Sequence, residues 1–462
     1  MMHRLLILMI CLGWPDADKA ATKPEPKTAT KSEKVARVPV RTETASNVTE
    51  DWPQFRGPDG QGHGAGEKLP IKWSELTNIA WKTDLPGQGW SSPVIQGGNI
   101  WLTTALNEGG TLKLLRIDKS TGKLEQEITV FNVPTPGKVH PKNGHASPTP
   151  LIDNGRIYVH FGTHGTACLD ETGKILWKAT LVYYHHHGPA ASPILVGKRL
   201  IIPCDGYLKS FYHDEVKSGV SDLQFVVALN ADTGEVDWKS PRKGRHSYAT
   251  PLLIEVDGRQ QVISPGGDRV SAYNPESGEE IWSVAYTGYS LIPRPVFGHG
   301  LVYVCTGYDN AQLLAIRPDG KGDVTDTHVA WSFKQSVSFT PSPILVGDEL
   351  YFVSDGGVGT CLDAQSGKLL WKRRFGGNFS ASPILADNKL YFVAEEGTTH
   401  VLEPGKQYKR LSANRINGTT FASPAVSGTA LFLRSDKSLY RIEERPKTPP
   451  KPKAGSGKAV KG

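Results

Sequence analysis

A short motif, in which a hydroxyl residue is followed by proline and an apolar run, recurs eight times along this chain of 462 residues. The anchoring prolines are Pro93, Pro148, Pro193, Pro251, Pro295, Pro343, Pro383 and Pro424. Successive prolines lie between 40 and 58 residues apart, and Arg294 replaces the hydroxyl residue only in the fifth motif. A repeat near this length is typical of units that each contribute four short strands to a ring. The spacing therefore predicts an all-β fold.

The sixth unit, Thr340 to Trp371, shows the order of strands within one repeat. Four short candidate strands of three to five residues alternate there with turns rich in glycine, aspartate and serine. Short apolar runs bounded by such turn residues are typical of antiparallel strands joined by hairpins. The other units repeat this order, with insertions. We therefore predict an eight-bladed β-propeller of four-stranded blades, with seven blades as the alternative.

The two ends of the repeat array predict how the ring closes. The last unit supplies three strands and then runs into a tail rich in proline and lysine. The segment from about Asn78 to Leu85 has the pattern of a fourth strand, including Trp81, but no strands precede it. Because closure removes exposed sheet edges, we expect this segment to pair with residues 438–443 and complete the last blade.

One turn of the repeat carries a family resemblance. The segment Ala228 to Trp238, with Gly234 between them, resembles the tryptophan-docking motif of pyrroloquinoline-quinone (PQQ) propellers, in which Ala, Gly and Trp hold the first, seventh and eleventh places. Gln126 replaces the tryptophan in the first unit, and the seventh unit lacks the pattern. The resemblance extends from about Asp51 to Glu444. It implies the fold, but the family includes quinoprotein dehydrogenases, the outer-membrane assembly lipoprotein BamB and envelope proteins without known chemistry.

Composition divides the chain into five parts. Residues 1–21 resemble an export signal, in which Cys11 is a weak candidate for lipidation, and residues 22–50 read as a disordered linker. Residues 51–77 are expected to form an N-terminal clasp, with Trp52 and Phe55 docked on the side of the propeller. Residues 78–444 form the PQQ-like propeller, and residues 445–462 form a basic disordered tail. The chain is thus predicted to be exported, either periplasmic or associated with the cell envelope.

The net charge of +7 lies mostly outside the predicted propeller. The tail contributes six basic residues and no acid, and the body between residues 51 and 444 is close to neutral. No basic surface for nucleic acid is therefore expected on the propeller body. Contact with a membrane is expected only through the tail or through lipidation, and the protein is expected to be a monomer.

The cysteines indicate packing more than redox chemistry. Cys168 and Cys361 hold the same third-strand position in units two and six, and Cys204 and Cys305 end second strands in units three and five. Each pair belongs to non-adjacent units, so we predict buried free thiols. The adjacent cysteine pair of many quinoprotein alcohol dehydrogenases is absent, as is a Cys-x-x-Cys-His haem motif. The segment 318–326 suggests a calcium loop only loosely, and we expect a polar hairpin turn there.

The candidate site is the mouth of the central channel. In a propeller, the segment leading into each first strand and the loop joining the second and third strands open on the same face. The residues predicted to bind a ligand there are Trp90, His145, His187, His246, Tyr248, Arg294 and Asn378. Further residues expected at this mouth are Gln88, Asn143, Tyr289, Phe379, His160, His164, Asp205, Asp268, Arg269, Tyr308, Asp309 and Asp355. Such a mouth suits a polar or anionic ligand, and His187→Ala and Arg294→Ala are expected to leave folding intact.

Histidines are concentrated in one part of the chain. Nine of the 14 lie between His140 and His246. Imidazoles converging from His145, His187 and His246 could hold zinc or copper, since metal sites take ligands from several loops. The alternative is a rim of hydrogen-bonded histidines without metal, and we assign no metal site.

Three functions from different classes fit the sequence. The favoured one is a non-catalytic binding scaffold of the cell envelope, BamB-like in fold, that holds a protein partner or a polar or anionic small ligand. The second is a dehydrogenase using PQQ with calcium, although no calcium-binding set of Glu, Asn and Asp can be identified. The third is a metal-assisted enzyme acting on carbohydrate. We assign no cofactor, and PQQ with calcium remains the alternative.

Overall fold

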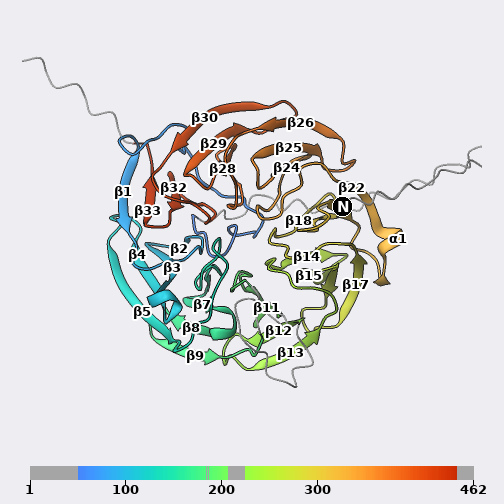
Figure 1. Cartoon of the computed structure of the whole chain (residues 1–462), viewed down its shortest axis with the longest axis horizontal. Helices are drawn as coiled ribbons and strands as arrows, with labels where there is room; N and C mark the ends of the chain where they lie inside the picture. The colour runs from blue at the N-terminus through green and yellow to red at the C-terminus, as the bar shows by residue number, and fades with distance from the viewer. Residues whose placement is uncertain (1–49, 184, 186, 207–223, 445–462) are drawn as a thin grey trace, which may run out of the picture. The chain divides into compact units, whose positions relative to one another are not determined.

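A computed structural model describes residues 50–183, 185, 187–206 and 224–444 of the protein. The signal-like segment, the linker up to residue 49 and the basic tail lie outside the described residues. The described residues form eight antiparallel sheets that follow one another around a ring (Figure 1). The eight-bladed, all-β fold predicted from the repeats is therefore confirmed.

The strands of the first four blades follow the repeat. Blade 1 contains β2 (Val94–Gln96), β3 (Asn99–Leu106), β4 (Thr111–Asp118) and β5 (Leu124–Asn132); blade 2 contains β6 (Leu151–Asp153), β7 (Arg156–His160), β8 (Thr166–Asp170) and β9 (Ile175–Ala179); blade 3 contains β10 (Ile194–Val196), β11 (Arg199–Asp205), β12 (Gln224–Asn230) and β13 (Val236–Pro241); blade 4 contains β14 (Leu252–Val256), β15 (Arg259–Gly266), β16 (Arg269–Tyr273) and β17 (Glu280–Ala285). Two short 3-10 helices lie in these blades, η1 (Asn107–Gly109) and η2 (Gly162–His164).

The remaining blades complete the ring. Blade 5 contains β18 (Val296–Gly298), β19 (Leu301–Cys305), β20 (Leu313–Ile316) and β22 (Val329–Phe333); blade 6 contains β23 (Ile344–Val346), β24 (Glu349–Val353), β25 (Val358–Asp363) and β26 (Leu369–Arg374); blade 7 contains β27 (Ile384–Ala386), β28 (Lys389–Val393), β29 (Thr398–Glu403) and β30 (Lys409–Arg415); blade 8 contains β31 (Ala425–Ser427), β32 (Ala430–Arg434), β33 (Ser438–Ile442) and β1 (Ile79–Asp84). In blade 8, β1 pairs antiparallel with β33, with Lys82 opposite Tyr440. The N-terminal strand thus occupies the outer edge of the last blade, as the sequence predicts.

The hydroxyl residue that precedes every first strand except that of blade 5 has a structural role. The backbone N–H of Ser92 donates to Thr149 Oγ1 at 3.0 Å, and that of Thr149 donates to Ser192 Oγ at 2.9 Å. Bonds of 2.9–3.0 Å continue this pattern at four further junctions between blades. These hydroxyls, which we call the hydroxyl ring, join neighbouring blades around the channel. In blade 2 the member is Thr149 before Pro150, so Pro148 is not the structural equivalent of the other anchoring prolines.

The docking motif also joins neighbouring blades. Trp177 Nε1 of blade 2 donates to the carbonyl of Ala231 in the turn of blade 3 at 2.9 Å. Gly234 lies in that turn at φ +78°, and a Cβ there would approach the Trp177 ring to 2.5 Å, so the motif requires glycine. Trp81, Trp238, Trp331 and Trp371 donate to the next blade in the same way. Gln126, which replaces the tryptophan in blade 1, donates to the Thr172 carbonyl at 3.2 Å.

Blade 4 departs from the repeat at its outer edge. The segment predicted to be a polar hairpin turn instead supplies β21 (Gly322–Asp323), which pairs parallel with β17, and helix α1 (Thr325–His328). Trp282 therefore donates to Gln261 Oε1 of its own blade at 2.8 Å, and Gln261 donates on to the Pro318 carbonyl at 3.1 Å. An insertion from blade 5 thus takes the place of the usual contact between the two blades.

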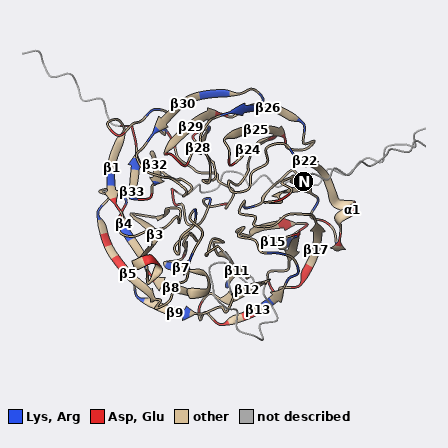
Figure 2. Cartoon of the chain, viewed as in Figure 1, with Lys and Arg blue, Asp and Glu red and all other residues tan. Residues whose placement is uncertain are grey.

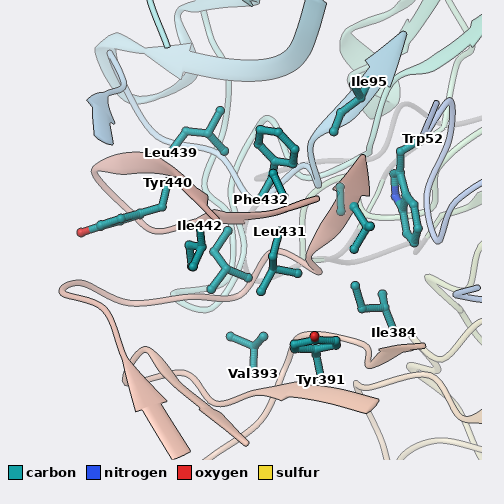
Figure 3. Packing of buried hydrophobic residues seen from close by; sticks show 14 of the residues in the cluster. Trp52, Ile95, Ile384, Tyr391, Val393, Leu431, Phe432, Leu439, Tyr440 and Ile442 are labelled. Carbon is teal, nitrogen blue, oxygen red and sulfur yellow. The ribbon is translucent and has the colours of Figure 1, made fainter. Parts of the chain in front are cut away.

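The core lies between adjacent blades. Seven clusters of buried apolar side chains fill the inter-blade layers of the described chain. The largest joins blades 7, 8 and 1 and includes Trp52, Ile95 and Leu431 (Figure 3). The four described cysteines are buried and free, as predicted. Basic and acidic residues both occur along the outer strands (Figure 2). No described helix is long and apolar enough to cross a bilayer.

The N-terminal clasp crosses the channel at the end formed by the hairpins between first and second strands. Trp52 exchanges two backbone hydrogen bonds of 2.8 Å with Ile95 of blade 1. Further along, Leu385 of blade 7 donates to the Gly62 carbonyl and accepts from Gly64. The clasp therefore contacts blades on both sides of the channel and closes this end. The sequence predicts docking of Trp52 and Phe55 on the side of the propeller, but Trp52 lies in the layer between blades beside the first strand of blade 1, and Phe55 lines the channel.

Candidate functional site

The open end of the channel holds a cavity of about 500 Å³. All eight blades contribute to its wall through their lead-in segments, the residues immediately before each first strand. The aromatic and imidazole side chains of the lining belong to Phe55, Trp90, His140, His187, Tyr248, Tyr289, Tyr308 and Phe421. The lining hydroxyls belong to Ser92, Ser147, Thr149, Ser192, Thr250, Ser290, Thr340, Ser380, Ser382 and Ser423. The clasp reaches this cavity from the other end through Phe55.

Three of the predicted ligand-binding residues line this cavity: Trp90, His187 and Tyr248. The ring of Trp90 packs against Phe421 with centroids 4.5 Å apart. The backbone N–H of His187 donates to the Tyr248 hydroxyl at 3.2 Å. These contacts come from blades 1, 8, 3 and 4, so the fold brings together side chains that are far apart in the sequence.

The other four predicted residues do not line the cavity. His145 and His246 are buried in the layer behind the wall, and Asn378 lies exposed on the rim, where its carbonyl accepts from the Glu395 N–H at 2.7 Å. His246 still contacts the lining, because its ring lies 5.7 Å from that of His187. A direct role in binding is therefore better supported for Trp90, His187 and Tyr248 than for these residues.

Arg294 is buried below the cavity, with 2% of its surface exposed. Its Nε donates to the Pro251 carbonyl at 2.9 Å, and its Nη1 donates to the Phe55 carbonyl of the clasp at 2.7 Å. Burial lowers the pKa of this guanidinium to about 10. Arg294 thus ties the clasp to blades 4 and 5. The sequence-based expectation that Arg294→Ala leaves folding intact conflicts with this position, because a buried and a partly buried carbonyl would lose their donors.

Sequence reasoning missed several lining residues: Phe55, His140, Lys142 and Phe421. A signal existed for Phe421, since it lies three residues before Pro424, just as Trp90 lies three residues before Pro93. No comparable signal marked His140 and Lys142, because they belong to a long insertion without a repeat partner.

That insertion, residues 133–149, reaches across part of the mouth. Lys142 Nζ lies 3.0 Å from Glu395 Oε1, which belongs to the loop between β28 and β29 of blade 7. Asn143 Nδ2 donates to the His187 carbonyl at 2.9 Å, and the backbone N–H of His140 donates to the same carbonyl at 3.1 Å. We call residues 133–149 the strap, because it connects blade 2 to blades 3 and 7.

Aromatic and imidazole rings form a continuous series around one side of the mouth. The ring of His187 lies 5.1 Å from that of His140 and 5.7 Å from that of His246. The series continues from His246 to Tyr289 at 5.4 Å and from Tyr289 to Tyr308 at 5.7 Å. Tyr308 is 55% exposed, so this wall presents apolar ring surface to solvent.

Two described cations of the rim, Lys142 and Arg245, are paired with carboxylates. Arg245 lies over the Tyr289 ring and binds Asp268 at 2.6 Å and Asp309 at 3.1 Å. The hydrogen bond from Arg245 lowers the pKa of Asp268. Deeper in blade 3, Asp205 accepts from Arg242 at 2.6 Å, and burial raises the pKa of this carboxyl. None of the described residues that line the cavity is an aspartate or a glutamate.

This lining does not fit a calcium ion, which takes six to eight oxygen ligands that usually include carboxylates. Among the described residues there is also no group of three His, Cys, Asp or Glu side chains arranged to hold a metal. The suggestion that His145, His187 and His246 converge on zinc or copper is therefore not supported by their positions. Only His187 of these three lines the cavity.

Comparison with protein families gives one match over most of the chain. A family model described as "Outer membrane protein assembly factor BamB" matches residues 124–245 and 222–445. Among individual proteins, BamB of Bordetella pertussis is 27% identical over 161 residues, which are 32% of this chain and 40% of that protein. Methanol dehydrogenase [cytochrome c] subunit 1 of Methylorubrum extorquens is 30% identical over 161 residues, which are 32% of this chain and 24% of that protein. These matches span less than half of each relative.

Solved structures show the same fold at low identity. BamB from Moraxella catarrhalis superposes with a TM-score of 0.54 and 15% identity, covering 79% of this chain and 100% of that chain. A europium-containing methanol dehydrogenase superposes with a TM-score of 0.58 and 11% identity, covering 84% of this chain and 90% of that chain. At these identities the structures agree in fold and do not separate a binding protein from an enzyme.

Proposed function

This chain belongs to the family described as outer membrane protein assembly factor BamB, and we propose that it is an exported, non-catalytic binding protein of the cell envelope. Its binding face is the open mouth of the channel, where it holds a protein partner or a small polar ligand. The name of the family, with its reference to the outer membrane, supports an envelope location.

The observation that carries this proposal is the chemistry of the cavity wall. The wall offers aromatic rings, hydroxyls and imidazoles, but its described residues offer no carboxylate. Binding needs shape, apolar surface and a few placed polar groups. General acid–base catalysis and calcium binding both usually need carboxylates within reach of the ligand. The described wall therefore meets the requirements of ligand binding better than those of acid–base catalysis or calcium binding.

The alternative is a dehydrogenase using PQQ with calcium. It is favoured by the similarity to methanol dehydrogenase and to the quinoprotein ethanol dehydrogenase of Pseudomonas putida, which is 28% identical over 226 residues. Its cofactor would supply the redox chemistry, and the chain would have to supply ligands for calcium. The described lining does not supply these ligands, so we place this function second. The third candidate, a metal-assisted enzyme acting on carbohydrate, has little support, because no group of three His, Cys, Asp or Glu side chains that could hold a metal is found among the described residues.

A site-specific photo-crosslinking experiment in the native host tests the proposal. A photoreactive phenylalanine analogue replaces Tyr308 at the mouth or, as the control, Leu176 on the outer strand β9, which is 43% exposed. We expect the protein in the envelope fraction, with a discrete adduct from position 308 that is absent from position 176. Retention in the cytoplasm, or alcohol oxidation by the purified protein with PQQ and calcium, would contradict the proposal.

A further inference from the structure

We propose that the cavity at the channel mouth binds a neutral oligosaccharide. This inference deepens the proposed function and rests on it, since it names the class of ligand that the mouth selects. Three properties of the wall carry it: the orientation of the hydroxyl ring, the flat apolar rings above it, and the pairing of the rim charges.

The hydroxyl ring supplies donors at the bottom of the cavity. Thr149, Ser192 and Thr250 each use an oxygen lone pair to accept a backbone N–H from the preceding blade, at 2.9–3.0 Å. A hydroxyl that accepts one bond in this way still has its own O–H proton to donate. Because all three residues line the cavity, a ligand that is rich in oxygen acceptors can bond to several of them at once.

The upper wall supplies flat apolar surface. Trp90 and Phe421 pack together at one side, and Tyr248, Tyr289 and Tyr308 stand at another. A sugar ring has C–H groups on its faces and hydroxyls around its edge, so it can lie on an aromatic ring while its hydroxyls bond to polar neighbours. Aromatic side chains that combine an apolar body with a polar tip suit such a ligand. The volume of about 500 Å³ is in the range of small-molecule sites.

The rim charges favour a neutral ligand over an acidic one. Lys142 is paired with Glu395, and Arg245 is paired with both Asp268 and Asp309. A carboxylate or phosphate of a ligand would have to displace a carboxylate that is already bound to each cation. It would also approach the two aspartates at Arg245, where like charges repel. A neutral sugar chain meets neither obstacle.

The backbone around the mouth offers little to an extended peptide. Peptides commonly bind by adding a strand to an exposed sheet edge. Here the backbone N–H groups of Trp90 and Tyr248 already donate to the carbonyls of Ala146 and Leu291 in the next lead-in segments, at 3.0 and 2.7 Å. Recognition therefore depends on side chains, which favours a ligand with many hydroxyls.

The test begins with the full-length protein on an array of neutral oligosaccharides, uronate-containing oligosaccharides and short peptides. The best neutral oligosaccharide is then titrated by calorimetry into the wild type, Trp90→Ala, Trp90→Phe and Leu176→Ser. We expect one-to-one binding that weakens at least tenfold in Trp90→Ala, less in Trp90→Phe, and not at all in Leu176→Ser. Circular dichroism confirms that each variant is folded, and Phe421→Ala replaces Trp90→Ala if the latter is not.

Several results would overturn this inference. One is that no neutral oligosaccharide binds at millimolar concentration, and another is that the protein selects acidic glycans or peptides. A third is that a neutral oligosaccharide binds Trp90→Ala as tightly as the wild type. If the inference fails while the crosslink from position 308 persists, the proposed binding function stands with a different ligand. If PQQ and calcium support alcohol oxidation, the proposed function itself fails.

Discussion

The two ends of the channel are built from the same eight repeats, yet one is sealed and the other is open. At the sealed end, the clasp is held by backbone pairs with Ile95 and Leu385 and by Arg294, which donates to the Phe55 carbonyl. At the open end, the lead-in segments leave a cavity walled by aromatic rings and hydroxyls, and among the described residues the strap, residues 133–149, crosses part of it. Hydrogen bonds to buried backbone groups dominate one end, and solvent-facing side chains dominate the other.

This difference separates stability from binding. Buried hydrogen bonds cost much to break, because each leaves a polar group without water. Exposed ion pairs and ring contacts cost little, so the residues of the mouth can vary without unfolding the protein. Substitutions at the sealed end should therefore change stability, and substitutions at the mouth should change binding.

The largest expected effect is that of Arg294→Ala at the sealed end. The buried carbonyl of Pro251 and the partly buried carbonyl of Phe55 lose a charged donor, and we expect a loss of about 3 kcal/mol in the free energy of unfolding. Urea denaturation measures this loss, and Arg410→Ala, at an exposed position of β30, is the matched control. A loss below about 0.5 kcal/mol would show that the clasp is not held by Arg294.

A smaller loss is expected for Asn414→Ala, which also acts on the clasp. The buried Asn414 side chain accepts from the Trp73 N–H at 3.1 Å and donates to the Ile71 carbonyl at 2.8 Å. Removing it should lower the free energy of unfolding by about 2 kcal/mol. The exposed Asn417→Ala serves as control, and equal stability of the two variants would contradict a structural role for these bonds.

Near the mouth, we expect His160 to make the free energy of unfolding depend on pH. Burial lowers the pKa of His160 to about 3, and its ring bonds to Thr166 Oγ1 at 2.8 Å. Since an unfolded histidine titrates near 6.5, the unfolded state binds one more proton between these values. The contribution of His160 to the free energy of unfolding is therefore fully present above pH 6.5 and is lost as the pH falls toward 3.

His160→Gln should remove this contribution. We expect the slope of unfolding free energy against pH to be smaller than that of the wild type by about 1.4 kcal/mol per pH unit at pH 4–6. Denaturation at a series of pH values measures it, and above pH 7.5 the two slopes should agree. Parallel curves throughout would mean that folding does not perturb His160.

The smallest effect on stability is expected for Lys142→Gln in the strap. The Lys142 side chain is 56% exposed, so loss of its ion pair with Glu395 should cost less than about 0.5 kcal/mol. Hydrogen exchange should instead become faster in residues 133–149. A large loss of stability here would break the contrast between the two ends, because the strap would then be structural.

The repeat predicted the blades because each motif has a local physical cause. The hydroxyl before proline accepts a backbone N–H of the preceding blade, and Gly234 is required beneath Trp177, so both leave a mark in the sequence. The distance of Trp90 from Pro93 marks it as a site residue. The sequence also places Arg294 at the mouth, because nothing local shows that Phe55, more than 200 residues earlier, meets it at the channel floor. Likewise, the pairing of Lys142 with Glu395 depends on ring closure.

The central claim is that the mouth is a binding site and not a quinone–calcium centre. Calorimetric titration of PQQ, with calcium present, into the purified full-length protein tests it most directly. The carboxylate-free lining of the described cavity predicts no saturable heat at high protein concentration. Saturable one-to-one binding, with alcohol-dependent dye reduction by the loaded protein, would contradict the account and place this chain among the quinoprotein dehydrogenases.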